Sequence, residues 1–206
     1  MQKLPFSAVI LAGGDSKRMG TNKAFLKLEG RNLIDIVFEK LNDLFKEVIV
    51  VTDRLEEFSY LPARVTTDLI DGCRKNSLRG IHAGLTLSSH SACFVTACDM
   101  PFPALPLINY MSRFAEDFDV VVPRIGSYYE PLFAFYNKTA LETINRHLEN
   151  NKLKIFDLYS GLCVKDIGED TVRLFDPQAL SFYNINTRED YLKAQKIYNP
   201  QKRVSC

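Results

Sequence analysis

The residues with the clearest chemical meaning form a basic, glycine-containing segment near the N-terminus. Gly13 and Gly14 follow an apolar run over residues 6–11, which predicts a short buried strand. Glycine has no Cβ and tolerates positive φ, so backbone N–H groups beside it can approach an anion closely. Arg18 and Lys23 then add full positive charge. The segment predicts a phosphate-binding loop, and the alternative is an ordinary glycine turn with a solvated run of charge.

This loop matches neither of the two common nucleotide-binding patterns. A Walker loop places Lys directly after its last glycine, whereas Gly20 is followed here by Thr21. The dinucleotide pattern G-x-G-x-x-G is also missing. If the segment binds phosphate, it belongs to another class of nucleotide-binding protein.

A second chemical signal is the carboxylate of Asp99. It follows an apolar run over residues 92–97 and precedes Met100 and Pro101. Proline disfavours helical backbone at the residue before it, so the carboxylate is expected at the end of a strand. Mg²⁺ prefers oxygen ligands and needs only one or two carboxylates when phosphates complete its shell. Asp99 is therefore a candidate metal ligand, and the alternative is a cap on the following helix.

The elements that must position these residues alternate between strands and helices, which predicts an α/β fold. It is expected to be a Rossmann-like, three-layer α/β/α fold with a mostly parallel sheet. A later strand over 130–136 is expected to be antiparallel and to lie at the edge of the sheet. Polar loops are expected over 68–79 and 123–130. The other expected strands are 6–11, 48–51, 65–67, 92–97 and 119–122, and the expected helices run from 33 to 45, from 105 to 111 and over 138–149, 152–159 and 187–198.

Strand direction predicts where the polar residues gather. In open parallel sheets, ligands bind beyond the carboxyl ends of the strands. The glycine loop follows the first expected strand, Thr52 and Asp53 follow the second, Asp68 follows the third and Asp99 follows the fourth. All of them are therefore expected along one edge of the sheet.

Composition limits the classes of function. The 206 residues are 46% hydrophobic, which suits one domain spanning residues 1–206. The net charge of +1 gives no reason to expect nucleic-acid or membrane binding, and no apolar run is long enough to span a bilayer. Five cysteines without a C-x-x-C spacing suit a reducing cytoplasm, and three scattered histidines give no reason to expect zinc.

The loop pattern LAGG-x-S-x-RMG-x-x-K over residues 11–23 resembles the signature of the pyrophosphorylase-like nucleotidyltransferases, and most closely the molybdenum cofactor guanylyltransferase (MobA) family. The residues around Asp99 are similar to that family's metal-binding strand end. Three further segments resemble family motifs in the same order: 78–81, 130–136 and 184–190. The chain departs from the family at Asn76 and Ser77, where the family has Gly-Pro.

The resemblance implies roles for individual residues. Lys23, Arg18 and Asp99 would be catalytic, with Asp99 holding Mg²⁺. Asp68 would accept hydrogen bonds from a guanine edge, and Asp71 is the alternative for this role. Asn184 and Asn186 would face the acceptor, and the alternative is that they only shape a turn. The implied binding residues for nucleotide and acceptor are Leu11, Ala12, Gly13, Gly14, Lys23, Thr52, Asp68, Gly80, Asp99, Asn184 and Asn186.

The activity implied by the resemblance is transfer of GMP from GTP to molybdopterin-bound molybdenum cofactor, with release of pyrophosphate. Proteins that deliver or accept the cofactor are possible partners. Two alternatives stay open. One is a sibling nucleotidyltransferase, specific for CTP with the same acceptor or for a sugar phosphate. The other is a non-catalytic nucleotide-binding protein. The family's cytidylyl members typically show L-A-A-G where this chain has Gly13.

Overall fold

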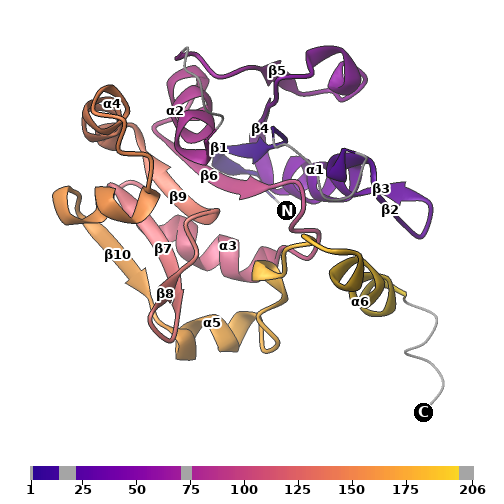
Figure 1. Ribbon diagram of the computed structural model, residues 1–206. Coiled ribbons are helices and arrows are strands. Elements are labelled where there is room, and N and C mark those ends of the chain that lie inside the picture. The colour runs from indigo at the N-terminus through magenta and orange to yellow at the C-terminus, as the bar shows by residue number, and fades with distance from the viewer. Residues whose placement is uncertain (1, 14–21, 71–75, 200–206) are drawn as a thin grey trace.

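The computed structural model describes residues 2–13, 22–70 and 76–199, and its centre is an eight-stranded sheet (Figure 1). The strand order is β10-β7-β9-β6-β1-β4-β5, with β8 paired to β7. The bounds are β1 Leu4–Leu11, β4 Phe45–Val51, β5 Arg64–Thr66, β6 Ala92–Ala97, β7 Val120–Ile125, β8 Tyr128–Tyr129, β9 Phe133–Asn137 and β10 Val164–Ile167. A separate hairpin is formed by β2 (Lys27–Leu28) and β3 (Arg31–Asn32).

Helices cover both faces of this sheet, so the predicted three-layer α/β/α arrangement is confirmed. Figure 1 shows α2 and α4 above the sheet and α3 and α5 below it. The α-helices are α1 Leu33–Leu44, α2 Ser77–Leu87, α3 Leu105–Met111, α4 Leu141–Glu149, α5 Glu169–Phe175 and α6 Arg188–Tyr198. Short 3₁₀ helices are η1 Lys23–Phe25, η2 Leu55–Phe58, η3 Ser112–Phe114, η4 Lys138–Ala140, η5 Ile155–Gly161 and η6 Leu180–Phe182.

The alternation of side chains along β1 explains the two apolar layers. Ile10 packs into a cluster with residues of α1, α3 and α5, whereas its neighbour Val9 packs into a second cluster with residues of α2 and α4. Successive residues of a strand point to opposite faces, and helices cover both faces of this sheet, so both side chains are fully buried. A strand buried on both faces is continuously apolar, which is the pattern of residues 6–11.

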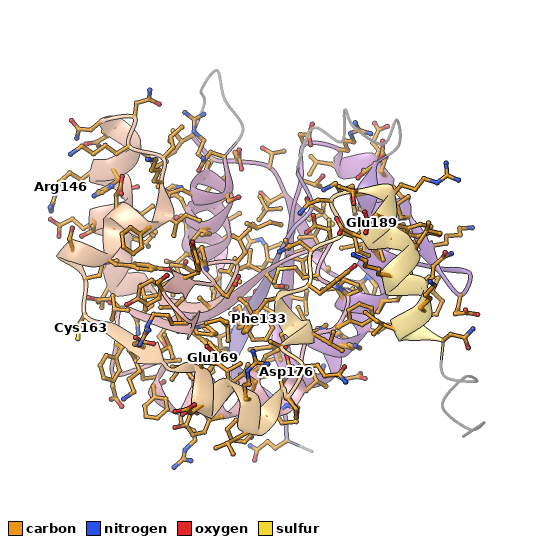
Figure 2. The ribbon with its side chains drawn as sticks, turned by 60° about the horizontal axis from the view of Figure 1, so that its bottom comes forward. Phe133, Arg146, Cys163, Glu169, Asp176 and Glu189 are labelled. Carbon is orange, nitrogen blue, oxygen red and sulfur yellow. The ribbon has the colours of Figure 1, made fainter. Side chains whose placement is uncertain are left out.

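The predicted position of the antiparallel strand was wrong. β9 is antiparallel, but it lies inside the sheet between β6 and β7, pairing Phe133 with Thr96 and Val120 with Tyr136. Figure 2 shows Phe133 near the centre of the molecule, whereas Cys163, just before the edge strand β10, lies at the margin. All five residues of β9 are buried, as expected for a strand inside the sheet, and Phe135 and Tyr136 pair with β7 as well as with β6.

Other differences from the expected elements are local. The predicted loop over 68–79 ends earlier, because Asn76 caps α2 by accepting a hydrogen bond from the Leu78 N–H at 2.7 Å. Residues 155–161 form a 3₁₀ helix where an α-helix was predicted, and β10 and α5 were not predicted. The predicted helix start at Thr187 is confirmed, with reciprocal capping bonds to Asp190.

A third apolar cluster fixes the C-terminal segment. Ile185 and Ala194 are buried against Leu28, Leu33 and Ile36, and α6 lies beside the β2–β3 hairpin (Figure 1). The Tyr191 hydroxyl also donates to the Lys27 carbonyl at 2.6 Å. This packing holds residues 184–186 next to the end of β6. Within the described part of the chain, no helix is long and apolar enough to cross a membrane.

Gly84 provides a test of the α2–β1 contact. A Cβ at Gly84 would lie 2.5 and 2.6 Å from the two γ-methyl groups of Val9, which cannot both rotate away. Gly84→Ala should lower the free energy of unfolding by about 1–3 kcal/mol, measured by urea denaturation. A Gly→Ala change inside a helix without a clash would raise the free energy of unfolding by roughly 1 kcal/mol. The sign of the measured change therefore tells whether the clash with Val9 is present. Gly161→Ala is the matched control, because its Cβ would meet nothing closer than 3.8 Å.

Candidate active site

A cleft of about 400 Å³ opens at the carboxyl ends of β1 and β6. These strands are parallel and adjacent, with Leu11 paired to Ala97. The loops that follow them therefore begin side by side, as the strand order requires. The lining residues are Leu11, Ala12, Gly13, Asn22, Lys23, Ser77, Ala97, Cys98, Asp99, Leu132, Asn184 and Asn186.

Most of the site residues predicted from the sequence lie in this one cleft, although they come from three distant parts of the chain. Thr52, Asp68 and Gly80 are not part of its lining. Gly14 and Arg18 lie outside the described residues. The predicted residues that line the cleft are Leu11, Ala12, Gly13, Lys23, Asp99, Asn184 and Asn186.

The ion pair between Lys23 and Asp99 is the electrostatic centre of the cleft. The Lys23 Nζ lies 3.3 Å from the Asp99 Oδ2, and both side chains are at least four-fifths buried. Burial raises the pKa of the Asp99 carboxyl, because it disfavours the charged form, and the charge of Lys23 partly opposes this shift. The cleft thus holds a poorly solvated carboxylate beside a cation.

Asn186 joins this pair from the C-terminal segment. The Lys23 Nζ donates to the Asn186 Oδ1 at 2.6 Å, and the Ile185 N–H donates to the Asp99 carbonyl at 3.0 Å. The Asn184 side chain instead donates to the Phe182 carbonyl at 3.2 Å, a local bond of the kind that shapes turns. The two asparagines thus differ in what they contact, and Asn186 is the one bonded to Lys23.

The donor atoms around Asp99 suit a hard metal ion. Mg²⁺ takes oxygen ligands and keeps water and phosphate oxygens in its shell, so one protein carboxylate is sufficient. Burial raises the pKa of the neighbouring Cys98 thiol far above its usual range, so it stays protonated and does not compete as a thiolate ligand. Among the described residues, no group of three or more His, Cys, Asp or Glu side chains could enclose a metal ion.

Gly13 does not use glycine's backbone freedom. Its φ is not positive, and a Cβ there would lie no closer than 3.8 Å to Thr52 and Asp53. The residue is exposed at the mouth of the cleft, directly after Ala12, whose N–H donates to the Val51 carbonyl at 2.8 Å.

Gly80, which the family resemblance places among the binding residues, is buried in α2, where a Cβ would lie 2.8 Å from the Leu11 Cδ2. The space beside this glycine is filled by Leu11, so helix packing accounts for the residue.

Thr52 and Asp68 follow β4 and β5, on the far side of β1 from Asp99. Thr52 is buried, and its hydroxyl donates to the Ala12 carbonyl at 3.4 Å and accepts from the Arg54 N–H at 3.2 Å. Asp68 is half-buried. Burial lowers the pKa of the nearby His82 imidazole, and the charge of Asp68 acts in the opposite direction. Asp71, the rival to Asp68, lies outside the described residues.

The sequence analysis missed five lining residues: Asn22, Ser77, Ala97, Cys98 and Leu132. Ala97 and Cys98 directly precede the predicted Asp99. Asn22 caps η1 by accepting from the Ala24 N–H at 3.2 Å, and its position directly before Lys23 was the available signal. Ser77 begins α2 immediately after the Asn76 cap. Leu132 precedes β9, and no local pattern indicates that it reaches the cleft.

Comparisons with known proteins agree with this geometry. The sequence model of the MobA-like NTP transferase domain matches residues 8–159. A probable molybdenum cofactor guanylyltransferase from Natranaerobius thermophilus is 41% identical, covering 92% of this chain and 95% of the relative. A molybdenum cofactor guanylyltransferase from Desulfosudis oleivorans is 40% identical over 92% and 94%.

A solved structure supports the same assignment. Molybdopterin-guanine dinucleotide biosynthesis protein A from Archaeoglobus fulgidus superposes with a TM-score of 0.83 at 31% identity, covering 93% of this chain and 98% of that one. The match therefore includes the C-terminal part that the family model leaves out. With its sheet, its cleft and these relatives in agreement, the chain belongs to the family of MobA-like NTP transferase domains.

Proposed function

We propose that this protein transfers GMP from GTP to the terminal phosphate of molybdopterin-bound molybdenum cofactor, forming the guanine dinucleotide cofactor and pyrophosphate. The observation that carries the proposal is the contact of Lys23 with both Asp99 and Asn186 in a cleft at the carboxyl ends of β1 and β6. The names of the relatives supply the two substrates. We also treat residues 1–206 as one nucleotidyltransferase domain, which the single central sheet supports.

The reaction is an exchange of one P–O bond for another. An oxygen of the acceptor phosphate attacks the α-phosphorus of GTP, and the bond between the α-phosphorus and the bridging oxygen breaks as pyrophosphate leaves. Negative charge builds up on the α-phosphoryl oxygens and on the leaving group. Catalysis of this kind depends on positioning and electrostatic stabilisation and needs no covalent enzyme intermediate.

Each cleft residue has a defined part in this reaction. Lys23 would neutralise charge on the α-phosphoryl oxygens and the departing pyrophosphate, and the backbone around Gly13 would lie against the phosphates. Asp99 would hold Mg²⁺, which when bound supplies Lewis-acid stabilisation of the phosphoryl charge. Arg18 would reach the β- and γ-phosphates, and Asn186 would orient Lys23.

Recognition of guanine would take place on the β4–β5 side. A carboxylate can accept from both N1–H and N2–H of guanine, whereas adenine presents an acceptor at N1. Asp68, with Thr52 nearby, is the proposed reader of that edge. We further propose that the reaction takes place in the cytoplasm, with proteins that deliver or accept the cofactor as partners.

Asp99→Asn should abolish most turnover without loss of fold. The loss of a metal ligand at the phosphoryl group should lower kcat on the order of a hundredfold or more. Because burial holds the pKa of Asp99 above its ordinary value, ionisation of this carboxyl costs folding free energy as the pH rises from the ordinary pKa through the raised one, and this cost is present at neutral pH. The melting temperature at neutral pH should therefore not fall.

Pyrophosphate release from GTP and the cofactor, titrated with Mg²⁺, measures the activity of this variant, and a thermal melt measures its stability. Asp117→Asn, at an exposed carboxylate outside the cleft, is the matched control. Near wild-type turnover by a folded Asp99→Asn protein would refute the metal assignment.

Lys23→Ala should lower the transfer rate by roughly 10²–10³, the cost of removing one electrostatic stabiliser of the transition state. Lys27→Ala is the control, because Lys27 is exposed on β2 and its described contacts, the pairing with Asn32 and the bond from Tyr191, involve its backbone, which the substitution keeps. Single-turnover kinetics with saturating GTP would compare the two variants. Equal losses would mean that general positive charge matters and that Lys23 has no specific role.

The base assignment can be tested by thermal shift with Mg²⁺. GTP should raise the melting temperature more than CTP or ATP, and Asp68→Ala should remove this preference, because an unmatched hydrogen-bond pattern costs about 1–3 kcal/mol. Asp68→Asn is the isosteric variant, which keeps the shape but accepts only one hydrogen bond from guanine. A GTP preference that survives in both variants would exclude Asp68. Equal shifts by GTP and CTP would favour the sibling cytidylyltransferase.

A further inference from the structure

A second hollow lies on the α2–α4 side of the sheet and is made almost entirely of aromatic rings. Its volume is about 310 Å³, and its lining residues are Ser127, Tyr128, Tyr129, Pro131, Phe156 and Tyr159, here called the aromatic groove. None of these side chains carries a charge at neutral pH, and burial raises the pKa of Tyr159 to about 12. The groove therefore differs in character from the cleft that holds Lys23 and Asp99.

The rings are arranged as an open platform. The centroid of Tyr129 lies 5.8 Å from that of Phe156 and 5.3 Å from that of Tyr159, the latter edge-to-face. Phe156 is 61% exposed and Tyr128 is 77% exposed, so large parts of both rings face solvent. Exposed aromatic faces of this kind bind planar rings by stacking.

The base of the groove is held in place by buried groups. Tyr136 is fully buried in β9, and its hydroxyl donates to the Pro131 carbonyl at 2.8 Å and lies 3.5 Å from the Tyr159 hydroxyl. These contacts fix Pro131 and Tyr159 without a ligand. A planar group that enters the groove would meet a preformed surface, which lowers the entropic cost of binding.

The position of the groove relates it to the proposed reaction. Pro131 lines the groove and the next residue, Leu132, lines the cleft, so the two hollows adjoin at the turn directly before β9. Strand β9 is the neighbour of β6 on the side away from β1. The proposed base-reading residues lie on the opposite side, after β4 and β5. The groove is therefore on the side from which an acceptor would approach.

We propose that the aromatic groove binds the planar pterin ring of the acceptor, while the acceptor's phosphate reaches the cleft at Lys23. The division follows from chemistry: an uncharged aromatic surface suits a heteroaromatic ring, and the charged cleft suits a phosphate. The volume is within the range of small-molecule sites, of roughly 300–1,000 Å³. This inference rests on the proposed function, since it assigns a subsite to the acceptor of that reaction.

Phe156 offers a graded test. Stacking on one aromatic ring contributes about 1–3 kcal/mol, which converts to a roughly 5- to 150-fold change in affinity. Phe156→Ala and Phe156→Leu should raise the KM for the molybdenum cofactor by a factor in this range, with the KM for GTP unchanged. Phe156→Tyr keeps the ring and should behave as wild type. Leu174→Ala, at an exposed apolar residue outside the groove, is the control.

A binding measurement separates the groove from the reaction. Neopterin monophosphate is a fluorescent pterin, and its anisotropy can be titrated against each variant without GTP; the protein has no tryptophan to interfere. Weaker binding by Phe156→Ala and Phe156→Leu, with retention in Phe156→Tyr, supports the groove even if the wild type transfers no GMP. Failure of the wild type to transfer GMP would refute the proposed function and would leave the assignment of the groove standing.

Three results would overturn the assignment of the groove. The first is an unchanged affinity for neopterin monophosphate and an unchanged acceptor KM in Phe156→Ala. The second is full retention of both by Phe156→Leu, which would exclude ring stacking. The third is a change of oligomeric state on light scattering in Phe156→Ala with pterin binding intact, which would mean that a second protein chain covers the groove.

Discussion

A buried carboxylate needs a cation nearby, and this requirement organises the cleft. Asp99 lies at the end of an internal strand, where burial disfavours its charged form, and Lys23 lies 3.3 Å away. Lys23 is held in turn by Asn186, and the backbone of Ile185 bonds to Asp99. Segments more than 160 positions apart in the chain therefore meet around one ion pair, which the packing of η1, β6 and the C-terminal segment keeps together.

The sheet brings these segments together because it places the ends of strands that are distant in the sequence along one edge. β1 and β6 deliver the loop and the carboxylate, β4 and β5 extend the edge on one side, and β9 extends it on the other. Since β9 runs antiparallel, the residues before it, and not those after it, lie at this edge. The cleft and the aromatic groove are thus neighbours because one strand in the sheet is reversed.

The sequence allowed the parallel core and the cleft residues to be predicted, because a buried strand followed by glycine or aspartate is a local pattern. Asp99 and Lys23 were identified in this way, and both line the cleft. The interior position of β9 was not predictable, since pairing partners depend on contacts between distant residues. The packing role of Gly80 was not predictable for a similar reason: the atom beside it belongs to Leu11, 69 positions earlier in the chain. Local pattern indicates that a glycine matters, and only packing indicates why.

The order in which the ribosome makes these segments has a consequence of its own. β10, the last strand of the sheet, ends at Ile167, whereas Asn184–Asn186 come later and α6 later still. Every strand of the sheet is therefore synthesised before Asn186, which bonds to Lys23, exists. The cleft is completed by the final stretch of synthesis, so a product truncated after β10 would contain every strand of the sheet and still lack Ile185 and Asn186, which bond to Asp99 and Lys23.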